Sequence, residues 1–180
     1  DFKPLEDFIP IGAVVDVPMT LIAKPQTTQT NAKDLLAYIR ANKEKINLAN
    51  AGVGSASHLC GLLLQNAMKT DLTTVPFSGT GPAMTALLGG NVDIMCDQTT
   101  NTTGQIKGGK VKAVAVTSKN KLANFPDLPP LASELPGFEV GVWHILYAPK
   151  NTPADVVTQL QSALQASIKD PSYAAKMKHL

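Results

Sequence analysis

The segment from Ile46 to Leu64, INLANAGVGSASHLCGLLL, constrains the fold of this chain more than any other. A short apolar strand leads through a Gly/Ser loop directly into a helical pattern. Gly52 and Gly54 permit backbone conformations that other residues rarely adopt, and Ser55 offers a helix cap. The free N–H groups in the first turn of such a helix attract anions, so the segment predicts an anion-binding loop. We expect the buried face of the helix to be formed by three leucines at helical spacing, Leu59, Leu62 and Leu63.

The supply of basic residues limits how an anion can be bound. Arg40 is the only arginine among 16 basic residues and belongs to a different predicted helix, so a bidentate arginine clamp is not expected. Backbone N–H groups, hydroxyls, helix dipoles and His58 would have to hold a carboxylate or phosphate. A net charge of +2 with scattered basic residues does not indicate a nucleic-acid surface. No apolar run approaches the roughly 20 residues that span a bilayer.

Two further features leave alternatives open. The chain begins Asp1-Phe2-Lys3-Pro4, so either no export signal existed or it was removed before this segment. Cys60 and Cys96 form neither a disulfide framework nor a zinc pattern. We interpret both as small buried hydrophobic residues, with a mutual disulfide as the alternative.

Strand and helix patterns alternate along most of the chain, which predicts an α/β fold with a mixed, mainly parallel sheet. The expected strands cover residues 8–15, 19–24, 46–50, 72–75, 92–96, 111–117 and 140–148. The expected helices cover residues 32–41 with Asn31 as cap, 55–64, 82–88 from Pro82, 152–168 with Thr152 as cap, and 171–180. Residues 98–103 are expected to form a polar loop before a short helix, and residues 119–137 an irregular connection with at most one short helix.

Two Gly/Ser/Thr-rich turns, residues 52–57 and 78–81, each follow a strand and precede a helix. In a parallel sheet both lie at the carboxyl edge, where ligands bind, and both helix N-termini would face one crevice. Asp97 and Gln98 follow the next strand and would line the same crevice, offering a charge or an amide to a donor on the ligand. The alternative is that these are ordinary connecting turns whose glycines serve geometry alone.

The sequence provides little for catalysis. His58 can donate to an anion from the first helical turn, or it is a partly exposed surface residue, whereas His144 is expected to pack and His179 to be solvated. No two histidines have metal-ligand spacing, so no metal is expected. Cys60 or Ser57 as a nucleophile with His58 as base is disfavoured, because neighbouring helical positions project about 100° apart. We therefore predict no catalytic residues and no enzyme.

Several ordered motifs resemble one known family. They are NAGVGSASHL at residues 50–59, VPFSGTGPAMTALLGGNVDIMCD at 75–97, IKGGKVKAVAVTS at 106–118 and FPDLPPLASELPGFEVGVWHILYAPKNTPADVV at 125–157. These segments resemble the Bug family, the extracytoplasmic solute-binding receptors of tripartite tricarboxylate transporters. The resemblance implies a two-lobed periplasmic binding protein of type II that closes on a small organic carboxylate. It also implies a periplasmic location, membrane transporter subunits as partners, no cofactor and no catalysis.

The resemblance divides the chain into three parts. Residues 1–24 would hold interlobe crossing strands and a remnant of the first lobe, residues 25–139 the ligand-binding second lobe, and residues 140–180 the return strand and helices of the first lobe. The ligand-binding residues carried over are Gly52, Val53, Gly54, Ser55, Ser57, His58, Ser78, Gly79, Thr80 and Asp97.

The chain also departs from the family pattern. Phe77-Ser78-Gly79 stands where the family usually has an aromatic and a basic residue before the glycine. The family's N-terminal segment and C-terminal helices are lacking, so we expect a fragment. Its apolar stripe of Val156, Leu160 and Leu164 would then be covered by self-association or swapping. The alternative functions are a ligand-sensing effector domain of a regulator, which can share this fold, and an enzyme on the same scaffold. The enzyme is disfavoured because the predicted crevice lacks a paired acid and base.

Overall fold

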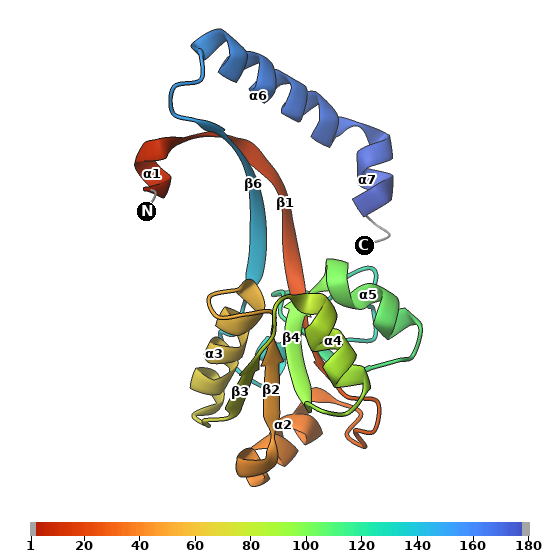
Figure 1. Ribbon diagram of the computed structural model, residues 1–180. Helices are drawn as coiled ribbons and strands as arrows, with labels where there is room; N and C mark the ends of the chain where they lie inside the picture. Colours follow the sequence, from red (N-terminus) through yellow and green to blue (C-terminus); the bar gives the residue numbers. More distant parts are fainter. Residues whose placement is uncertain (1–2, 178–180) are drawn as a thin grey trace. The chain divides into compact units, whose positions relative to one another are not determined.

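The computed structural model describes residues 3–177 and divides into two compact units (Figure 1). The terminal unit comprises residues 1–17 and 143–180, and the central unit residues 18–142. Strand β1 (Phe8–Ala23) runs through both units and pairs with β6 (Gly141–Pro149). Two separate strands were predicted here, and this is wrong. Proline at position 18 is compatible with extended backbone, and it precedes the pairing of β1 with β4, which begins at Met19, and with β5, which begins at Thr20.

The central unit is built on a mixed sheet with the strand order β3-β2-β4-β1-β5. Its remaining strands are β2 (Asn47–Asn50), β3 (Thr73–Pro76), β4 (Ile94–Gln98) and β5 (Lys112–Val116). Strand β2 pairs in parallel with β3 and β4, whereas β1 pairs antiparallel with β4 and β5. Strands β2 to β5 therefore share one direction, and the mixed α/β prediction is confirmed.

Helices flank this sheet on both faces. In the central unit they are α2 (Ala32–Ala41), α3 (Ala56–Met68), α4 (Thr80–Leu88) and α5 (Thr99–Lys107), with short 3₁₀ turns η1 (Lys43–Lys45) and η2 (Leu131–Ser133). The terminal unit contains α1 (Pro4–Asp7), α6 (Ala154–Lys169) and α7 (Pro171–Met177). No helix among residues 3–177 is long and apolar enough to cross a membrane.

Alternating side chains of the strands form two apolar cores, one on each face of the sheet. Leu21, Leu48 and Ile94 pack with α2 and α3, and their neighbours Ile22 and Met95 pack with α4. The period-2 alternation of the strands thus distributes apolar residues to both faces.

The buried face of α3 differs from the prediction. Leu59, Leu62 and Leu63 are 52%, 45% and 47% exposed. The residues that α3 buries are Ser57, Cys60, Gly61, Leu64 and Met68. Small residues allow the first half of the helix to approach the sheet closely: a Cβ atom added at Gly61 would lie 2.9 Å from Leu48 Cδ2. Close approach of the backbone therefore sets the rotation of the helix, and the leucines face outward.

Three further differences between the prediction and the structure concern where helices begin. Helix α4 begins at Thr80 and not at Pro82, and α6 begins at Ala154, with Pro153 and not Thr152 in the cap position. The predicted loop at 98–103 is mostly helix α5. Threonine hydroxyls in α5 donate to carbonyl oxygens four residues earlier, Thr102 to Gln98 and Thr103 to Thr99, so the polar side chains are satisfied within the helix.

Of the other local predictions, one is confirmed and one is wrong. Asn31 caps α2, with its Oδ1 accepting from the Asp34 N–H at 2.9 Å, as predicted. His144, predicted to pack, is exposed, and the stripe on α6 is exposed except for Leu164, which lies against Gly12. Residues 178–180 of the predicted last helix, including His179, lie outside the described residues.

Candidate functional site: helix N-termini at one edge of the sheet

The carboxyl ends of β2, β3 and β4 lie at the same edge of the central sheet, because these strands run in parallel. Each strand is followed directly by a helix, so α3, α4 and α5 all begin near this edge (Figure 1). The first N–H groups of each helix have no intrahelical acceptor, and the helix dipoles make their surroundings electropositive. All the residues discussed below belong to the central unit.

The loop after β2 is held by backbone contacts at its base. Asn50 Oδ1 accepts from the Gly52 N–H at 2.9 Å, and the Asn50 carbonyl accepts from the Phe77 N–H at 3.0 Å. Gly52 and Gly54 have φ values of 118° and 82°, as their predicted role in the loop requires. A Cβ atom at Gly52 would also lie 3.1 Å from the Phe77 carbonyl oxygen. The two turns of the predicted site therefore touch through backbone atoms.

The start of α3 leaves backbone donors available. Ser55 caps the helix, its Oγ accepting from the His58 N–H at 3.1 Å, which confirms the predicted cap. His58 Nδ1 accepts from the Gly54 N–H at 3.3 Å, so the imidazole fixes the loop and keeps its Nε2 as a donor. No described residue accepts a hydrogen bond from the Ala56 or Ser57 N–H. The first turn of α3 therefore offers two backbone donors.

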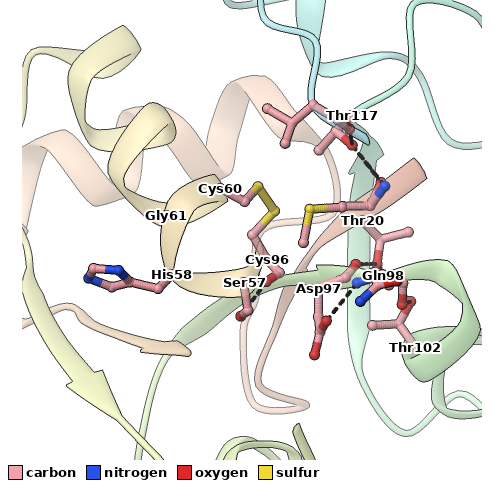
Figure 2. The surroundings of a disulfide bond; sticks show 12 residues. Thr20, Ser57, His58, Cys60, Gly61, Cys96, Asp97, Gln98, Thr102 and Thr117 are labelled. Atoms are coloured by element: carbon pink, nitrogen blue, oxygen red, sulfur yellow. Dashed lines mark hydrogen bonds between the residues drawn. A yellow bond between two sulfur atoms is a disulfide. The ribbon is translucent and has the colours of Figure 1, made fainter. Parts of the chain in front are cut away.

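Ser57 and Cys60 fasten α3 to the end of β4 (Figure 2). The buried Ser57 hydroxyl donates to the Cys96 carbonyl oxygen at 2.6 Å, so its proton is engaged within the protein. Cys60 and Cys96 form a disulfide with a Cα–Cα distance of 6.0 Å. Both cysteines are buried, as predicted, but the interpretation as two separate hydrophobic residues is wrong. Their 36-residue separation gives no sign of a pairing that only the packing of α3 on β4 creates.

Asp97, at the end of β4, joins the starts of α4 and α5. The residue as a whole is 2% exposed. Oδ2 accepts from Thr80 Oγ1 at 2.7 Å, and Oδ1 accepts from the Gln98 N–H at 2.7 Å and from Asn101 Nδ2 at 3.2 Å. All three donors are neutral groups. The predicted pair Thr80 and Asp97 is therefore in direct contact, at the N-termini of two helices.

The second turn is open to solvent. Gly79 is the N-cap residue of α4, with a φ of 126°, and Ser78 is exposed. No described residue accepts from the N–H groups of Thr80 or Gly81. Together with the start of α3, this edge of the sheet presents backbone N–H groups from two loops beside one buried carboxyl group.

Two asparagines were missed by the sequence reasoning. Asn101 donates to Asp97 from α5, in a segment predicted as loop. Asn50 is 1% exposed, and its Nδ2 has no partner among the described residues. A polar residue that ends an apolar strand before a glycine turn could have pointed to Asn50, because asparagine commonly bonds to the backbone two residues later.

The arrangement suits binding rather than catalysis. His58 is directed away from the buried Ser57 and from Asp97 (Figure 2). The Ser57 hydroxyl already donates to a carbonyl oxygen, so no nucleophile and base are paired here. Among residues 3–177, no group of three or more His, Cys, Asp or Glu side chains could hold a metal ion. The site therefore consists of backbone N–H donors at two helix starts and a buried carboxyl acceptor beside them.

The fold is shared with solved periplasmic binding proteins. The model of the Tripartite tricarboxylate transporter family receptor matches residues 1–179. The chain therefore belongs to this receptor family, which confirms the resemblance carried by its motifs.

Individual relatives also support membership of this family. A UPF0065 protein in the TAR-I ttuE-ttuC' intergenic region of Agrobacterium vitis is 45% identical over 94% of this chain and 49% of its own length. The solved periplasmic binding protein BugD is 52% identical, with a TM-score of 0.92 over 99% of this chain and 60% of BugD. MatC from Rhodopseudomonas palustris, solved with bound malate, is 38% identical, with a TM-score of 0.86 over 96% of this chain and 59% of MatC. The chain thus spans about half the length of the curated relative.

Proposed function

We propose that the chain captures a small organic carboxylate at this edge of the central sheet and delivers it to a tripartite tricarboxylate-type membrane transporter. The observation that carries the proposal is the set of backbone N–H groups at the starts of α3 and α4 that have no acceptor among residues 3–177. Helix N-termini bind carboxylates without any need for arginine. The malate bound to MatC supports this ligand class.

Each proposed ligand-binding residue has a role in this scheme. The loop from Gly52 to Ser57 would enclose the carboxylate, with the N–H groups of Ala56 and Ser57 as donors, and His58 would hold the loop and donate from Nε2. Ser78, Gly79 and Thr80 would approach from the second turn. Asp97 would accept from the ligand, because a carboxyl group offers about four acceptor sites and three are occupied in the protein. A carboxylate that also carries a hydroxyl or amino group fits this pattern better than a plain one.

The remaining proposals follow the family pattern. Residues 25–139 would form the ligand-binding lobe, with residues 1–24 and 140–180 contributing crossing strands and parts of the other lobe. The protein would act in the periplasm, without catalysis, and would not bind nucleic acid. A disulfide is consistent with an oxidising compartment, which supports the periplasmic location.

A thermal-shift screen of small carboxylates, followed by calorimetry, tests the ligand. Malate is compared with succinate, which lacks the hydroxyl group, and with acetate. A ligand that binds only the folded state raises the melting temperature as its concentration exceeds Kd. We expect malate to be bound more tightly than succinate. No shift with any carboxylate would contradict the proposed function.

Two substitutions in α4 test the site. Thr80→Val removes the hydroxyl that holds the Asp97 carboxyl group in place. We expect it to weaken malate binding about tenfold, on the order of one hydrogen bond to a charged group, because the released carboxyl group no longer accepts from the ligand. Thr85→Val is the control, because Thr85 is exposed and its hydroxyl bonds only within the helix, to the Gly81 carbonyl. Equal affinities for both variants would remove Thr80 and Asp97 from the site.

We also propose that the terminal unit associates with a second copy of the chain. Its large exposed apolar side chains include Trp143, at 68% exposure, and the stripe residues Val156 and Leu160 on α6. Exposed apolar surface of this kind commonly marks an interface. Light scattering at high concentration should show a dimer that Leu160→Glu weakens, and a monodisperse monomer would contradict the proposal.

A further inference from the structure

The last two side chains of β4 before Gln98 connect to different helices. Successive side chains of a strand point to opposite faces. Cys96 is bonded to α3 twice, through the disulfide to Cys60 and through its carbonyl oxygen, which accepts from the Ser57 hydroxyl. Asp97 is bonded to α4 through Thr80 and to α5 through Asn101. One short segment of strand therefore holds the starts of three helices.

The first half of α3 has few apolar contacts of its own to hold it on the sheet. Its buried residues there are Ser57, Cys60 and Gly61, whereas the larger buried side chains, Leu64 and Met68, lie in its second half. Leu59 and Leu62 are 52% and 45% exposed, so the apolar contacts of this half with the core come mainly from small residues, Ala56 and Gly61 among them. Burial of apolar area stabilises helix packing roughly in proportion to the area, so the first half depends on its bonds to Cys96.

From this arrangement we infer that the Cys60–Cys96 disulfide is a positioning element of the ligand site. It fixes the first two turns of α3 to the end of β4, and so keeps the free N–H groups of Ala56 and Ser57 at a fixed place relative to Asp97. This inference rests on the proposed function for its effect on binding. Without the disulfide, the first half of α3 moves away from β4 more often, and a ligand must order it on binding.

The alternative is that the disulfide only stabilises the whole unit. Local and global roles differ in where they change hydrogen exchange. Loss of a positioning element speeds the exchange of amides at residues 60–62 more than that of residues 66–68 in the same helix, because local release of the first half adds to any loss of global stability. Loss of a purely global contribution speeds both groups equally, because both then exchange through complete unfolding.

The test uses Cys60→Ala/Cys96→Ala, which removes the disulfide without leaving a reactive thiol. We expect exchange at residues 60–62 to be accelerated, relative to the parent, by a factor at least tenfold larger than the factor at residues 66–68. Affinity for malate, measured by calorimetry, should fall at least tenfold. Leu64→Ala is the control, because it creates a cavity under the second half of α3 and keeps both bonds to Cys96, so its malate affinity should stay within twofold.

The outcomes separate this inference from the proposed function. If the parent does not bind malate, the proposed function fails for this ligand, and hydrogen exchange alone decides the positioning role. Equal acceleration along α3, or unchanged malate affinity in the double variant, overturns the inference. Should the double alanine variant not fold, Cys60→Ala/Cys96→Val restores apolar volume beside β4 and is subject to the same two criteria.

Discussion

Adding one methyl group to α3 tests how closely this helix lies against β2. Gly61→Ala places a Cβ atom 2.9 Å from Leu48 Cδ2 and 3.5 Å from Leu48 Cγ. Leu48 is 1% exposed and belongs to the core, so it has little room to move away. Overpacking of this kind costs about 1–3 kcal/mol, whereas alanine gains about 1 kcal/mol over glycine in a helix interior. We therefore expect Gly61→Ala to lower the free energy of unfolding by about 1 kcal/mol.

Gly104→Ala is the matched substitution in α5. Apart from the chain neighbours and the backbone of α5 itself, no atom lies within 4 Å of the Cβ position at Gly104, so the helix propensity acts alone. This variant should gain about 1 kcal/mol, and the two variants should differ by about 2 kcal/mol. Urea denaturation followed by circular dichroism measures both, as opposite shifts of the unfolding midpoint from the parent. If Gly61→Ala were stabilised as much as Gly104→Ala, the close approach of α3 to β2 would be refuted.

Three other predictions concern single bonds. Cys60→Ala/Cys96→Ala removes the disulfide and should lower the free energy of unfolding by about 4 kcal/mol. This is the chain entropy expected for a 36-residue separation, and urea denaturation of the variant and of the parent under oxidising conditions measures it. Asn31→Ala removes the cap of α2 and should cost about 1 kcal/mol in the same assay, against Thr85→Val as a surface control. Hydrogen bonds from the Ser172 hydroxyl and N–H lower the pKa of Asp170 below 3.8, so they stabilise the start of α7 above that pH. That support should be lost as the pH falls through the lowered pKa, and NMR chemical shifts of α7 should show fraying that Asp170→Ala makes independent of pH.

Sequence patterns predicted the features of this fold that depend on neighbouring residues. Asn31 and Asp34 form their cap within four residues of each other, and Gly89 follows α4 as the pattern indicated. The rotation of α3 could not be predicted in this way, because hydrophobicity favoured Leu59, Leu62 and Leu63. The face that is buried depends instead on how near Gly61 comes to Leu48, which is a contact between separate elements.

The same distinction applies to the site. Glycines, caps and strand ends predicted that Gly52, Gly54, Ser55, Thr80 and Asp97 would lie near one edge, because parallel strands end together. Their exact partners depended on contacts across the sheet. The Ser57 hydroxyl bonds to Cys96 and the Cys60 thiol is engaged in a disulfide, which only the packing of α3 on β4 reveals. The roles of these residues toward a ligand remain predictions for the binding experiments.

Val53 is a position at which a dye could be attached to this chain as an optical reporter. Its side chain is 82% exposed at the tip of the loop, between two glycines that already have left-handed backbone conformations. The only two cysteines in the sequence are bonded to each other inside the core. A Val53→Cys variant would therefore carry a single reactive thiol, and an environment-sensitive dye attached there would report on the loop without any other position being labelled.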